Sequence, residues 1–308
     1  MNEQVAPPLT EGIITALVTP LDRAGEVDTP ALDALVDFQV ERGVHGLFVL
    51  GTSGEGLLLS TTQRGKLVEH VLARVAGKLP VAVHCGAADT TTAASLVSVA
   101  ASAGARTVAA IPPLFFNYTE TGIYEHYRQL SDAAPELDHY LYDNPDRVGY
   151  SLGLDVTRRL IAEVPCIRGI KDTGDSLGRI TTYFALTDKI QVFTGNNVII
   201  LGALVMGAAG AVSTMANVVP DLFTAIYAAY GKGELGEARD LQLTAARLQS
   251  TLVGLPYVAA AKYLLTLRGL PGGHTRSPLP ELSSEQQSTL EQRVHRDPAL
   301  ARWLTPVS

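Results

Sequence analysis

One lysine, Lys171, stands out among the residues whose surroundings suggest chemistry. Residues 166–173 read Cys-Ile-Arg-Gly-Ile-Lys-Asp-Thr, so a mostly apolar, β-branched stretch ends on an amine, and a polar loop follows. This pattern predicts a buried parallel strand whose last side chain emerges at the carboxyl end. A lysine held among apolar residues has a lowered pKa, and as a neutral amine it can attack a carbonyl carbon to form a Schiff base. The alternative is a structural lysine that pairs with Asp172 or caps the end of the strand.

A glycine-rich loop at residues 51–56 is the second candidate. It reads Gly-Thr-Ser-Gly-Glu-Gly and follows another apolar, strand-like run. Glycines let the backbone approach a ligand closely, and the adjacent hydroxyls of Thr52 and Ser53, together with free amide groups, form a cradle for an anion. A carboxylate or a phosphate would suit this cradle. The alternative is a turn whose hydroxyls cap the next helix.

A third candidate lies at the end of a strand-like run that finishes at Tyr142. Strand alternation sends Tyr140 and Tyr142 to the same face, with Tyr142 nearer the carboxyl end. A phenol beside a Schiff-base lysine can shuttle protons, because the neighbouring positive charge lowers its pKa. Arg147 offers a planar, bidentate partner for a substrate carboxylate. The alternatives are a core tyrosine and a surface arginine.

Three further polar residues have two interpretations each. Asn196 and Asn197 follow a strand-like run and either meet substrate hydroxyls or cap the next helix. His84 ends another run and either touches the site or is a hydrogen-bonded core histidine. The seven histidines are scattered, with no HExxH-type pair and no carboxylate cluster at ligand spacing, so the sequence predicts no metal site.

Short β-rich runs recur at intervals of roughly 20 to 35 residues and alternate with helical patterns, as repeated βα units require. Several of the helical patterns precede a glycine suited to a C-cap, namely Gly43, Gly77, Gly104 and Gly231. The predicted strands are 13–18, 46–50, 81–84, 107–111, 139–142, 168–171, 191–194 and 211–213. The predicted helices among them are 29–41, 62–76, 91–103, 120–133, 154–163, 177–187, 198–206 and 218–230.

Eight apolar strands alternating with eight helices favour a closed (β/α)8 TIM barrel over an open doubly wound sheet. No dinucleotide-type glycine loop opens the first βα unit, which also counts against the open sheet. After Gly233 only helical stretches follow, at 234–253, 257–268 and 283–293. We therefore divide the chain into a barrel with the active site (1–233) and a C-terminal helical extension packed on it (234–308), since about 75 residues rarely bury a sufficient core alone.

The composition bounds the possible partners and the compartment. The chain has 308 residues, of which 46% are hydrophobic and 18% charged, and this is typical of a globular enzyme. A net charge of −7 argues against nucleic acid or an anionic membrane as partner. Two cysteines, Cys85 and Cys166, fit a reducing cytoplasm, and the first residues lack a signal-peptide pattern. The apolar stretch 198–212 is too short to span a bilayer.

Three motifs occur in order at the expected strand ends, namely 51–55, 142–149 and 169–172. Together with residues 15–20 and 210–218, they resemble the N-acetylneuraminate lyase / dihydrodipicolinate synthase family of Schiff-base class I aldolases over nearly the whole chain. The resemblance implies a (β/α)8 barrel, a pyruvate-type 2-oxo acid bound covalently to Lys171, and no separate cofactor. It also implies a homo-oligomer, either a dimer or a tetramer. Its site residues would be Lys171 and Tyr142 in catalysis, with Thr52, Ser53, Arg147, Thr173, Gly195, Asn196 and Val212 binding substrate.

The sequence departs from the family's synthases at one position. Those enzymes are expected to lend a tyrosine across a dimer interface at a site that matches Phe115, which has no hydroxyl. Tyr118 lies three residues further on and could replace it. Arg147 does match the arginine that receives the aldehyde's carboxylate in the synthases, whereas Thr173 resembles the threonine that contacts a polyol in the 2-keto-3-deoxy sugar-acid aldolase branch.

These observations lead to one expected function and two alternatives. We expect a lyase that cleaves or condenses pyruvate or a 2-keto-3-deoxy acid through an iminium on Lys171. The first alternative is a dihydrodipicolinate synthase that joins pyruvate to aspartate semialdehyde. The second is a non-catalytic 2-oxo-acid-binding protein, against which the pairing of Lys171 with Tyr142 argues.

Overall fold

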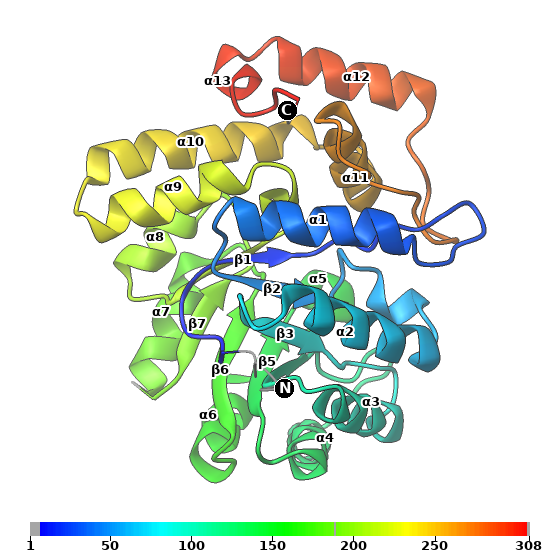
Figure 1. Ribbon diagram of the computed structural model, residues 1–308. Coiled ribbons are helices and arrows are strands. Elements are labelled where there is room, and N and C mark those ends of the chain that lie inside the picture. Colours follow the sequence, from blue (N-terminus) through cyan, green and yellow to red (C-terminus); the bar gives the residue numbers. More distant parts are fainter. Residues whose placement is uncertain (1–6, 188, 307–308) are drawn as a thin grey trace.

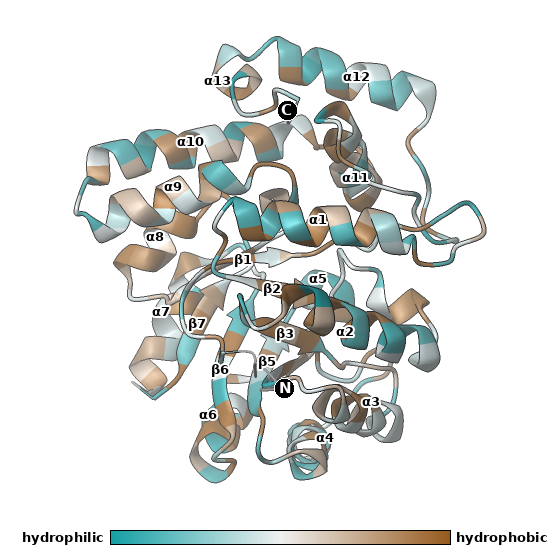
Figure 2. Ribbon diagram, in the orientation of Figure 1, coloured by the Kyte–Doolittle hydropathy of each residue, from teal (hydrophilic) through white to brown (hydrophobic). Residues whose placement is uncertain are grey.

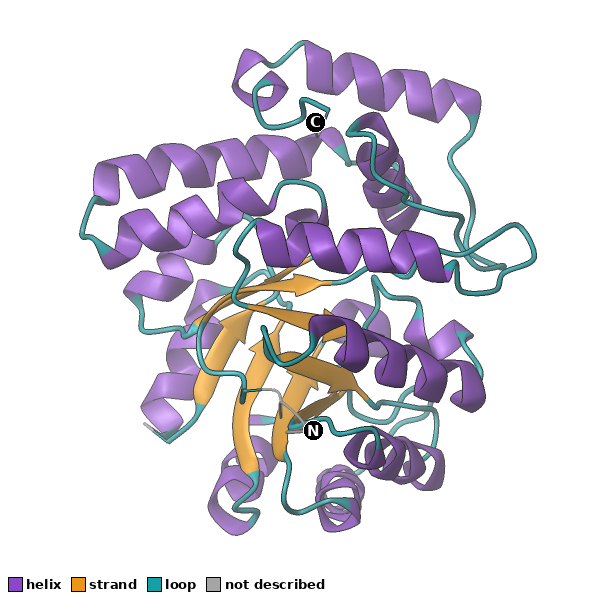
Figure 3. Cartoon of the chain, in the orientation of Figure 1, coloured by secondary structure: helices purple, strands orange, loops and turns teal. Residues whose placement is uncertain are grey.

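The computed structural model describes residues 7–187 and 189–306. Within them, eight parallel strands form a closed barrel in which each strand pairs with the next along the chain and β8 pairs with β1 (Figures 1 and 3). The predicted TIM barrel and its eight strands are therefore confirmed, with strand ends within two residues of the predicted ones. The strands are β1 (Gly12–Ala16), β2 (Gly46–Val49), β3 (Val81–His84), β4 (Thr107–Ala110), β5 (Asp138–Asp143), β6 (Ile167–Asp172), β7 (Gln191–Thr194) and β8 (Gly210–Ser213).

Helices surround the strands, as the purple ribbons of Figure 3 show. Those that follow the strands around the barrel are α1 (Thr29–Glu41), α2 (Thr61–Val75), α3 (Thr90–Ser102), α4 (Glu120–Ala133), α6 (Leu154–Glu163), α7 (Leu177–Leu186), α8 (Ile200–Val205) and α9 (Pro220–Gly231). Two short 3-10 turns, η1 (Gly56–Leu58) and η2 (Met215–Asn217), and the one-turn helix α5 (Pro145–Val148) lie in the connecting loops. The remaining helices are α10 (Leu235–Thr251), α11 (Tyr257–Leu267), α12 (Ser284–His295) and α13 (Pro298–Ala301).

The structure corrects three details of the predicted helices. Gly231 is the last residue of α9 rather than its C-cap, and the residue in the left-handed conformation is Gly233, with φ of 77°. Helix α8 begins at Ile200 rather than at residue 198, because the Asn196 side chain accepts a hydrogen bond from the Val198 amide and forms a turn there. Helices α5 and α13 were not predicted, since four residues carry no apolar periodicity.

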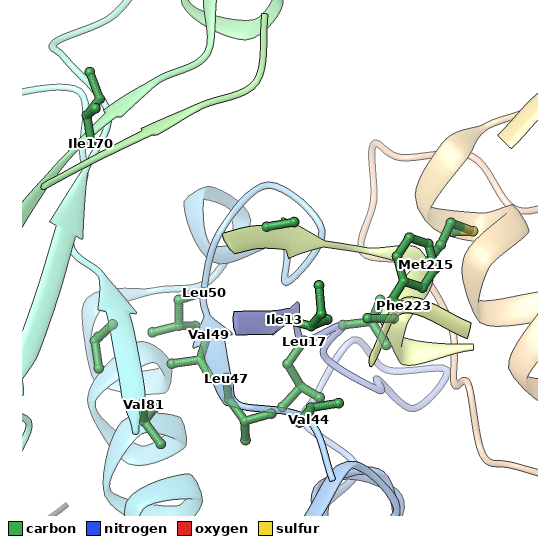
Figure 4. Packing of buried hydrophobic residues seen from close by; sticks show 14 of the residues in the cluster. Ile13, Leu17, Val44, Leu47, Val49, Leu50, Val81, Ile170, Met215 and Phe223 are labelled. Atoms are coloured by element: carbon green, nitrogen blue, oxygen red, sulfur yellow. The ribbon is translucent and has the colours of Figure 1, made fainter. Parts of the chain in front are cut away.

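Alternation along the strands separates two apolar clusters. Ile14, Phe48 and Val212 belong to the cluster inside the barrel. Ile13 and Leu47 belong to the larger cluster between the strands and the helices, part of which is drawn in Figure 4. Because successive side chains point to opposite faces, the same strands fill the barrel and hold the helices. The barrel interior is thus a packed core, and in barrels of this kind ligands bind at the carboxyl end of the strands.

A glycine in β6 shows how the barrel interior accommodates a large ring. Gly169 pairs with Tyr140 of β5, and a β-carbon on Gly169 would overlap the Tyr140 ring. The Tyr140 hydroxyl donates a hydrogen bond to the Leu9 carbonyl at 3.1 Å, so this tyrosine belongs to the core at the amino end of the barrel. Tyr142 is therefore the phenol that points to the carboxyl end.

Helices α10 to α13 lie together on one side of the barrel, beyond α1 and α9 (Figure 1). Leu248 of α10, Leu264 of α11 and Leu290 of α12 belong to the same continuous apolar cluster as the barrel helices. Figure 2 shows that the outer helix α12 is largely hydrophilic, so its apolar side is the one that is buried. The extension therefore shares a core with the barrel, while a domain boundary at residue 233 stays a prediction. No helix in the described ranges is long and apolar enough to cross a membrane.

Candidate active site

Lys171 and Tyr142 face each other at the carboxyl end of the barrel. They are register partners on β6 and β5, and both side chains point inward, since their neighbours Ile170 and Leu141 belong to the outer cluster. The Lys171 Nζ lies 3.9 Å from the centre of the Tyr142 ring and 4.1 Å from that of Phe48. Lys171 also lines the cavity described below.

Burial controls the charge of the Lys171 amine. The side chain is buried, and removal from water lowers its pKa below the ordinary value, although the neighbouring Tyr142 opposes the shift. A lowered pKa increases the fraction of neutral amine at moderate pH, and the neutral amine is the form that attacks a carbonyl.

Lys171 does not form the ion pair with Asp172 that one structural alternative requires. Asp172 points to the outside of the barrel, where it accepts hydrogen bonds from Arg179 Nε at 2.8 Å and from the Tyr183 hydroxyl at 2.7 Å. Of the six lysines, one other, Lys262 of α11, is also buried. Its Nζ binds Glu55 at 2.5 Å and two backbone carbonyl oxygens, so Lys262 is fixed by charge and hydrogen bonds. Lys171 makes no ion pair among the described residues, which leaves it available for chemistry.

The glycine loop after β2 turns back on itself at Leu50. This residue adopts the left-handed conformation with φ of 62°, and a β-carbon on Gly56 would overlap the Leu50 carbonyl oxygen. The tight return exposes Thr52 to the cavity and buries Ser53. The Ser53 hydroxyl lies 2.5 Å from the Thr214 hydroxyl, which follows β8. Hydroxyls from the loops after β2 and β8, two strands that both pair with β1, therefore meet at the cavity that Lys171 also lines.

His84 supports this loop from behind. It is buried, and burial followed by the charges of Arg64 and Lys171 lowers its pKa to about 3, so the imidazole is neutral. Nδ1 lies 3.0 Å from the Leu50 carbonyl oxygen, to which it must donate, and Nε2 accepts from the Ile111 amide at 3.4 Å. The ring also packs edge-on against Tyr142, with 5.7 Å between centroids. His84 is thus a hydrogen-bonded core histidine that does not line the cavity. It contacts Leu50 of the glycine loop and the ring of Tyr142, and so supports two parts of the site.

The Tyr142 hydroxyl is enclosed by polar side chains. It lies 3.3 Å from the Thr52 hydroxyl and accepts a hydrogen bond from the Asn144 amide at 2.9 Å. Burial alone would raise the pKa of Tyr142. The Lys171 charge and the hydrogen bonds with Thr52 and Asn144 outweigh it, so the pKa lies below its ordinary value.

A buried ion-pair network supports the strand ends from outside the barrel. Asp143 and Asp172 are register partners, each one residue beyond Tyr142 or Lys171, and Arg179 of α7 binds both carboxylates. Burial, together with the nearby Asp172, raises the pKa of Asp143 to about 6, although Arg179 opposes that shift. One arginine thus links the ends of β5 and β6 and fixes the spacing of the phenol and the amine.

Polar side chains from β6, β7 and the C-terminal helices form the far wall of the site. Thr173 packs against Gly195, where a β-carbon would overlap the threonine methyl group, so glycine is needed there. The Asn197 amide donates to Gln249 of α10 at 2.9 Å and to the Tyr257 hydroxyl at 3.3 Å. The buried Asn197 Oδ1 has no hydrogen-bond partner among the described residues.

These groups surround one cavity of about 330 Å³. All nine site residues predicted from sequence line it: Thr52, Ser53, Tyr142, Arg147, Lys171, Thr173, Gly195, Asn196 and Val212. Sequence reasoning missed Asn144, Thr214, Gln249 and Tyr257, which also line it. Phe115 and Tyr118 do not. Phe115 is 86% exposed with φ of 81°, and the Tyr118 hydroxyl donates to the Leu114 carbonyl. No cluster of three or more metal-binding side chains occurs in the described part of the chain.

Comparisons with known proteins agree with this architecture. The family model of the dihydrodipicolinate synthetase family matches residues 9–297. An N-acetylneuraminate lyase of Rhizobium meliloti is 34% identical, covering 92% of this chain and 94% of its own. A 4-hydroxy-tetrahydrodipicolinate synthase of Hyphomonas neptunium is 36% identical, covering 89% and 94%. Among solved structures, the E. coli K12 prophage protein YagE, in complex with pyruvate, has a TM-score of 0.90 and 25% identity, covering 94% and 98%.

The chain combines a closed barrel with a buried amine at the carboxyl end of its strands, and it matches N-acetylneuraminate lyases and dihydrodipicolinate synthases. These features define a class I, Schiff-base aldolase. The chain belongs to the dihydrodipicolinate synthetase family. Enzymes of this family act on pyruvate through a covalent Schiff base and need no external cofactor. The expected enzyme class is therefore confirmed, and the non-catalytic alternative is not better supported.

Proposed function

We propose that Lys171 is the Schiff-base nucleophile and Tyr142 its proton shuttle, in a lyase that cleaves a 2-keto-3-deoxy sugar acid to pyruvate and an aldehyde. The observation that carries this proposal is the register pairing of the two residues, which puts a buried amine 3.9 Å from the ring of a phenol whose pKa is lowered. Thr52 and Ser53 hold the carboxylate of the 2-oxo acid beside that amine.

The proposed reaction uses the phenol twice. The neutral Lys171 amine adds to the ketone to give a carbinolamine, and Tyr142 gives its proton to the departing hydroxyl. Water leaves, and an iminium and a phenolate remain, so charge and atoms balance. The phenolate then takes the proton of the C4 hydroxyl while the C3–C4 bond breaks toward the iminium. An aldehyde leaves, an enamine of pyruvate remains on Lys171, and protonation and hydrolysis release pyruvate.

The far wall supports a hydroxyl-bearing substrate. Asp175 and Asn196 are hydrogen-bonded to each other at 2.9 Å, and Asn197 lines the same wall. Carboxylate and amide oxygens accept hydrogen bonds from hydroxyl groups. A polyol tail suits this wall better than a second carboxylate, because Asp146 and Asp175 both line the cavity and repel anions.

The second candidate function is dihydrodipicolinate synthesis, and one observation favours it. Arg147 on α5 lines the exposed rim of the cavity, where it could receive the carboxylate of aspartate semialdehyde. Against it, Phe115 stands where the synthases are expected to lend a tyrosine across a dimer interface, and it brings no hydroxyl to a proton relay.

A trapping assay followed by a substrate comparison tests the proposal. Borohydride with pyruvate should add one reduced pyruvyl group, and peptide mass mapping should find it on Lys171. The value of kcat/KM is then compared for cleavage of 2-keto-3-deoxygluconate, cleavage of N-acetylneuraminate, and condensation of pyruvate with aspartate semialdehyde. The proposal expects the first substrate to be preferred by at least about tenfold. If Lys171 is labelled but no sugar acid is cleaved, the proposed Schiff base stands and the proposed substrate class is wrong.

We further propose that the enzyme acts in the cytoplasm as a homo-oligomer, either a dimer or a tetramer. The acidic net charge, the two free cysteines and the exposed Phe115 and Phe116 support this proposal. Light scattering at several protein concentrations measures the oligomeric state directly. A concentration-independent monomer would reject the proposed assembly.

A further inference from the structure

Asn144 occupies an unusual place at the end of β5. It is the N-cap residue of the one-turn helix α5, and its backbone carbonyl accepts hydrogen bonds from the Arg147 and Val148 amides. An asparagine at this position ordinarily turns its side chain back to cap the helix amides. Here the side chain makes no capping hydrogen bond. It is buried and turned into the cavity instead.

The Asn144 side chain closes a triangle of polar groups around the phenol. Its Nδ2 donates to the Tyr142 hydroxyl at 2.9 Å and lies 3.3 Å from the Thr52 hydroxyl, and these two hydroxyls are themselves 3.3 Å apart. An amide nitrogen can only donate, so the Tyr142 oxygen uses a lone pair on Asn144. The proton of the phenol is therefore left for Thr52 or for the reacting groups on Lys171.

We propose that Asn144 is the positioning residue that orients the Tyr142 hydroxyl and stabilises its phenolate form, in place of a second phenol. This inference rests on the proposed role of Tyr142 as proton shuttle. A donated hydrogen bond favours the charged form of an oxygen acid. An amide cannot pass a proton onward, however, so the route of the proton runs between Tyr142, Thr52 and the substrate within one subunit. The absence of a hydroxyl at Phe115 is then no obstacle to cleavage.

Two variants of Asn144 test this inference. Asn144→Leu removes the donor at similar volume, and Asn144→Asp keeps the shape but puts a negative charge beside the phenol. The pH profile of kcat/KM for the cleaved sugar acid reports the apparent pKa of Tyr142. In Asn144→Leu this apparent pKa should rise by about one unit. In Asn144→Asp the apparent pKa of Tyr142 should rise further, because a negative charge then lies beside the phenol. In both variants kcat should fall by about tenfold or more. At equilibrium, borohydride should still trap pyruvate on Lys171 in both variants.

The control is Asn117→Leu, which changes an exposed asparagine outside the cavity and should leave the profile unchanged. Circular dichroism and thermal melting confirm that each variant is folded. If Asn144→Leu has a much lower melting temperature than the unmodified protein, the inference is tested with the isosteric Asn144→Asp alone. An unchanged pH profile and kcat in a folded variant would overturn the inference, as would a fall in the apparent pKa of Tyr142. Failure of the unmodified enzyme to be labelled by pyruvate would instead reject the proposed function, so the two failures are distinguishable.

Discussion

Lys171 on β6 and Tyr142 on β5 are directly paired across two neighbouring strands, and this pairing fixes the reactive centre. Their positions depend on backbone register rather than on flexible loops. The same register pairs Asp143 with Asp172 on the outer face, where Arg179 links them. A slip of one residue between β5 and β6 would turn the amine and the phenol to opposite faces. The barrel itself thus holds the chemistry in place.

Lys171→Arg should abolish trapping of pyruvate by borohydride, because a guanidinium stays protonated and cannot form the Schiff base. The fold should be retained, since Arg is of similar length and Lys171 makes no ion pair among the described residues that the substitution would break. Intact-mass spectrometry after reduction measures the label, and peptide mapping locates it. Residual labelling of Lys171→Arg at the level of the unmodified protein would contradict the assignment.

Lys262 provides the matched control for that experiment. It is the other buried lysine, and burial lowers its pKa as well, but Glu55 holds it in an ion pair. Lys262→Met should lower the free energy of unfolding by about 3–5 kcal/mol, since it leaves Glu55 buried without a partner. The variant Glu55→Gln/Lys262→Met should recover part of this loss. Either protein, when folded, should still be labelled on Lys171.

Thr52→Val should weaken both binding and turnover. Thr52 is proposed to hold the substrate carboxylate, and its hydroxyl also contacts that of Tyr142. A hydrogen bond to a charged group contributes about 1.5–3 kcal/mol, so kcat/KM should fall about 10- to 100-fold, with a higher KM for the 2-oxo acid. Steady-state kinetics measures both constants. Unchanged constants would mean that the carboxylate is held elsewhere in the cavity.

Much of this architecture could be predicted from sequence, because it depends on local patterns. The eight strands follow from apolar runs with period two, and the place of Lys171 follows from an amine at the end of such a run. Tyr142 could be predicted because alternation assigns it to the face of Tyr140. Once the barrel is predicted, its carboxyl end collects these residues whatever their separation in the chain.

The residues that sequence reasoning missed depend on contacts between distant elements. Gln249 and Tyr257 reach the cavity from α10 and α11, and no local pattern tells which face of the extension meets the barrel mouth. Asn144 lies within a motif that was recognised, but an asparagine before proline predicts a turn or a cap. Only the structure shows its amide turned toward Tyr142. The two interpretations of His84 were separated by its hydrogen-bond partners, Leu50 and Ile111.

His84→Ala should lower kcat/KM without changing the shape of its pH profile. The substitution leaves the Leu50 carbonyl buried without its donor, which costs about 1–3 kcal/mol and loosens the cradle loop. His84→Asn should restore part of the activity, since its amide can still donate to Leu50. Because the pKa of His84 is about 3, no step between pH 5 and 8 should depend on it. Loss of an acid limb near neutral pH in His84→Asn would instead identify an acid–base role.

Asp143 should make stability fall as pH rises through the mildly acidic range. Its pKa is about 6 in the fold and 3.8 ordinarily, so the folded state binds the extra proton between these values. The stabilising contribution is complete below about pH 3.8 and is lost as pH rises through 6. Asp143→Asn does not titrate. The unmodified protein should lose stability between pH 4 and pH 7, whereas Asp143→Asn should not lose this contribution. The free energy of unfolding of Asp143→Asn minus that of the unmodified protein should therefore increase by roughly 2–3 kcal/mol from pH 4 to 7. Urea denaturation at several pH values measures this difference, and a constant offset would contradict it.

Phe115 bears on which reaction is native. If the synthase reaction needs a phenol at that position, condensation of pyruvate with aspartate semialdehyde should be weak here, while trapping of pyruvate on Lys171 stays normal. General acid–base assistance contributes about 10²–10⁴-fold, so Phe115→Tyr should raise synthase activity measurably if a neighbouring subunit brings this exposed loop to the site. Coupled kinetics on both proteins, with 2-keto-3-deoxygluconate cleavage as reference, measures the effect. Phe116→Tyr is the matched control, since it adds the same hydroxyl one residue away on the same exposed loop. Efficient synthase turnover by the unmodified protein, near ~10⁴ M⁻¹s⁻¹ or above, would show that Arg147 and the aspartate semialdehyde reaction define this enzyme instead.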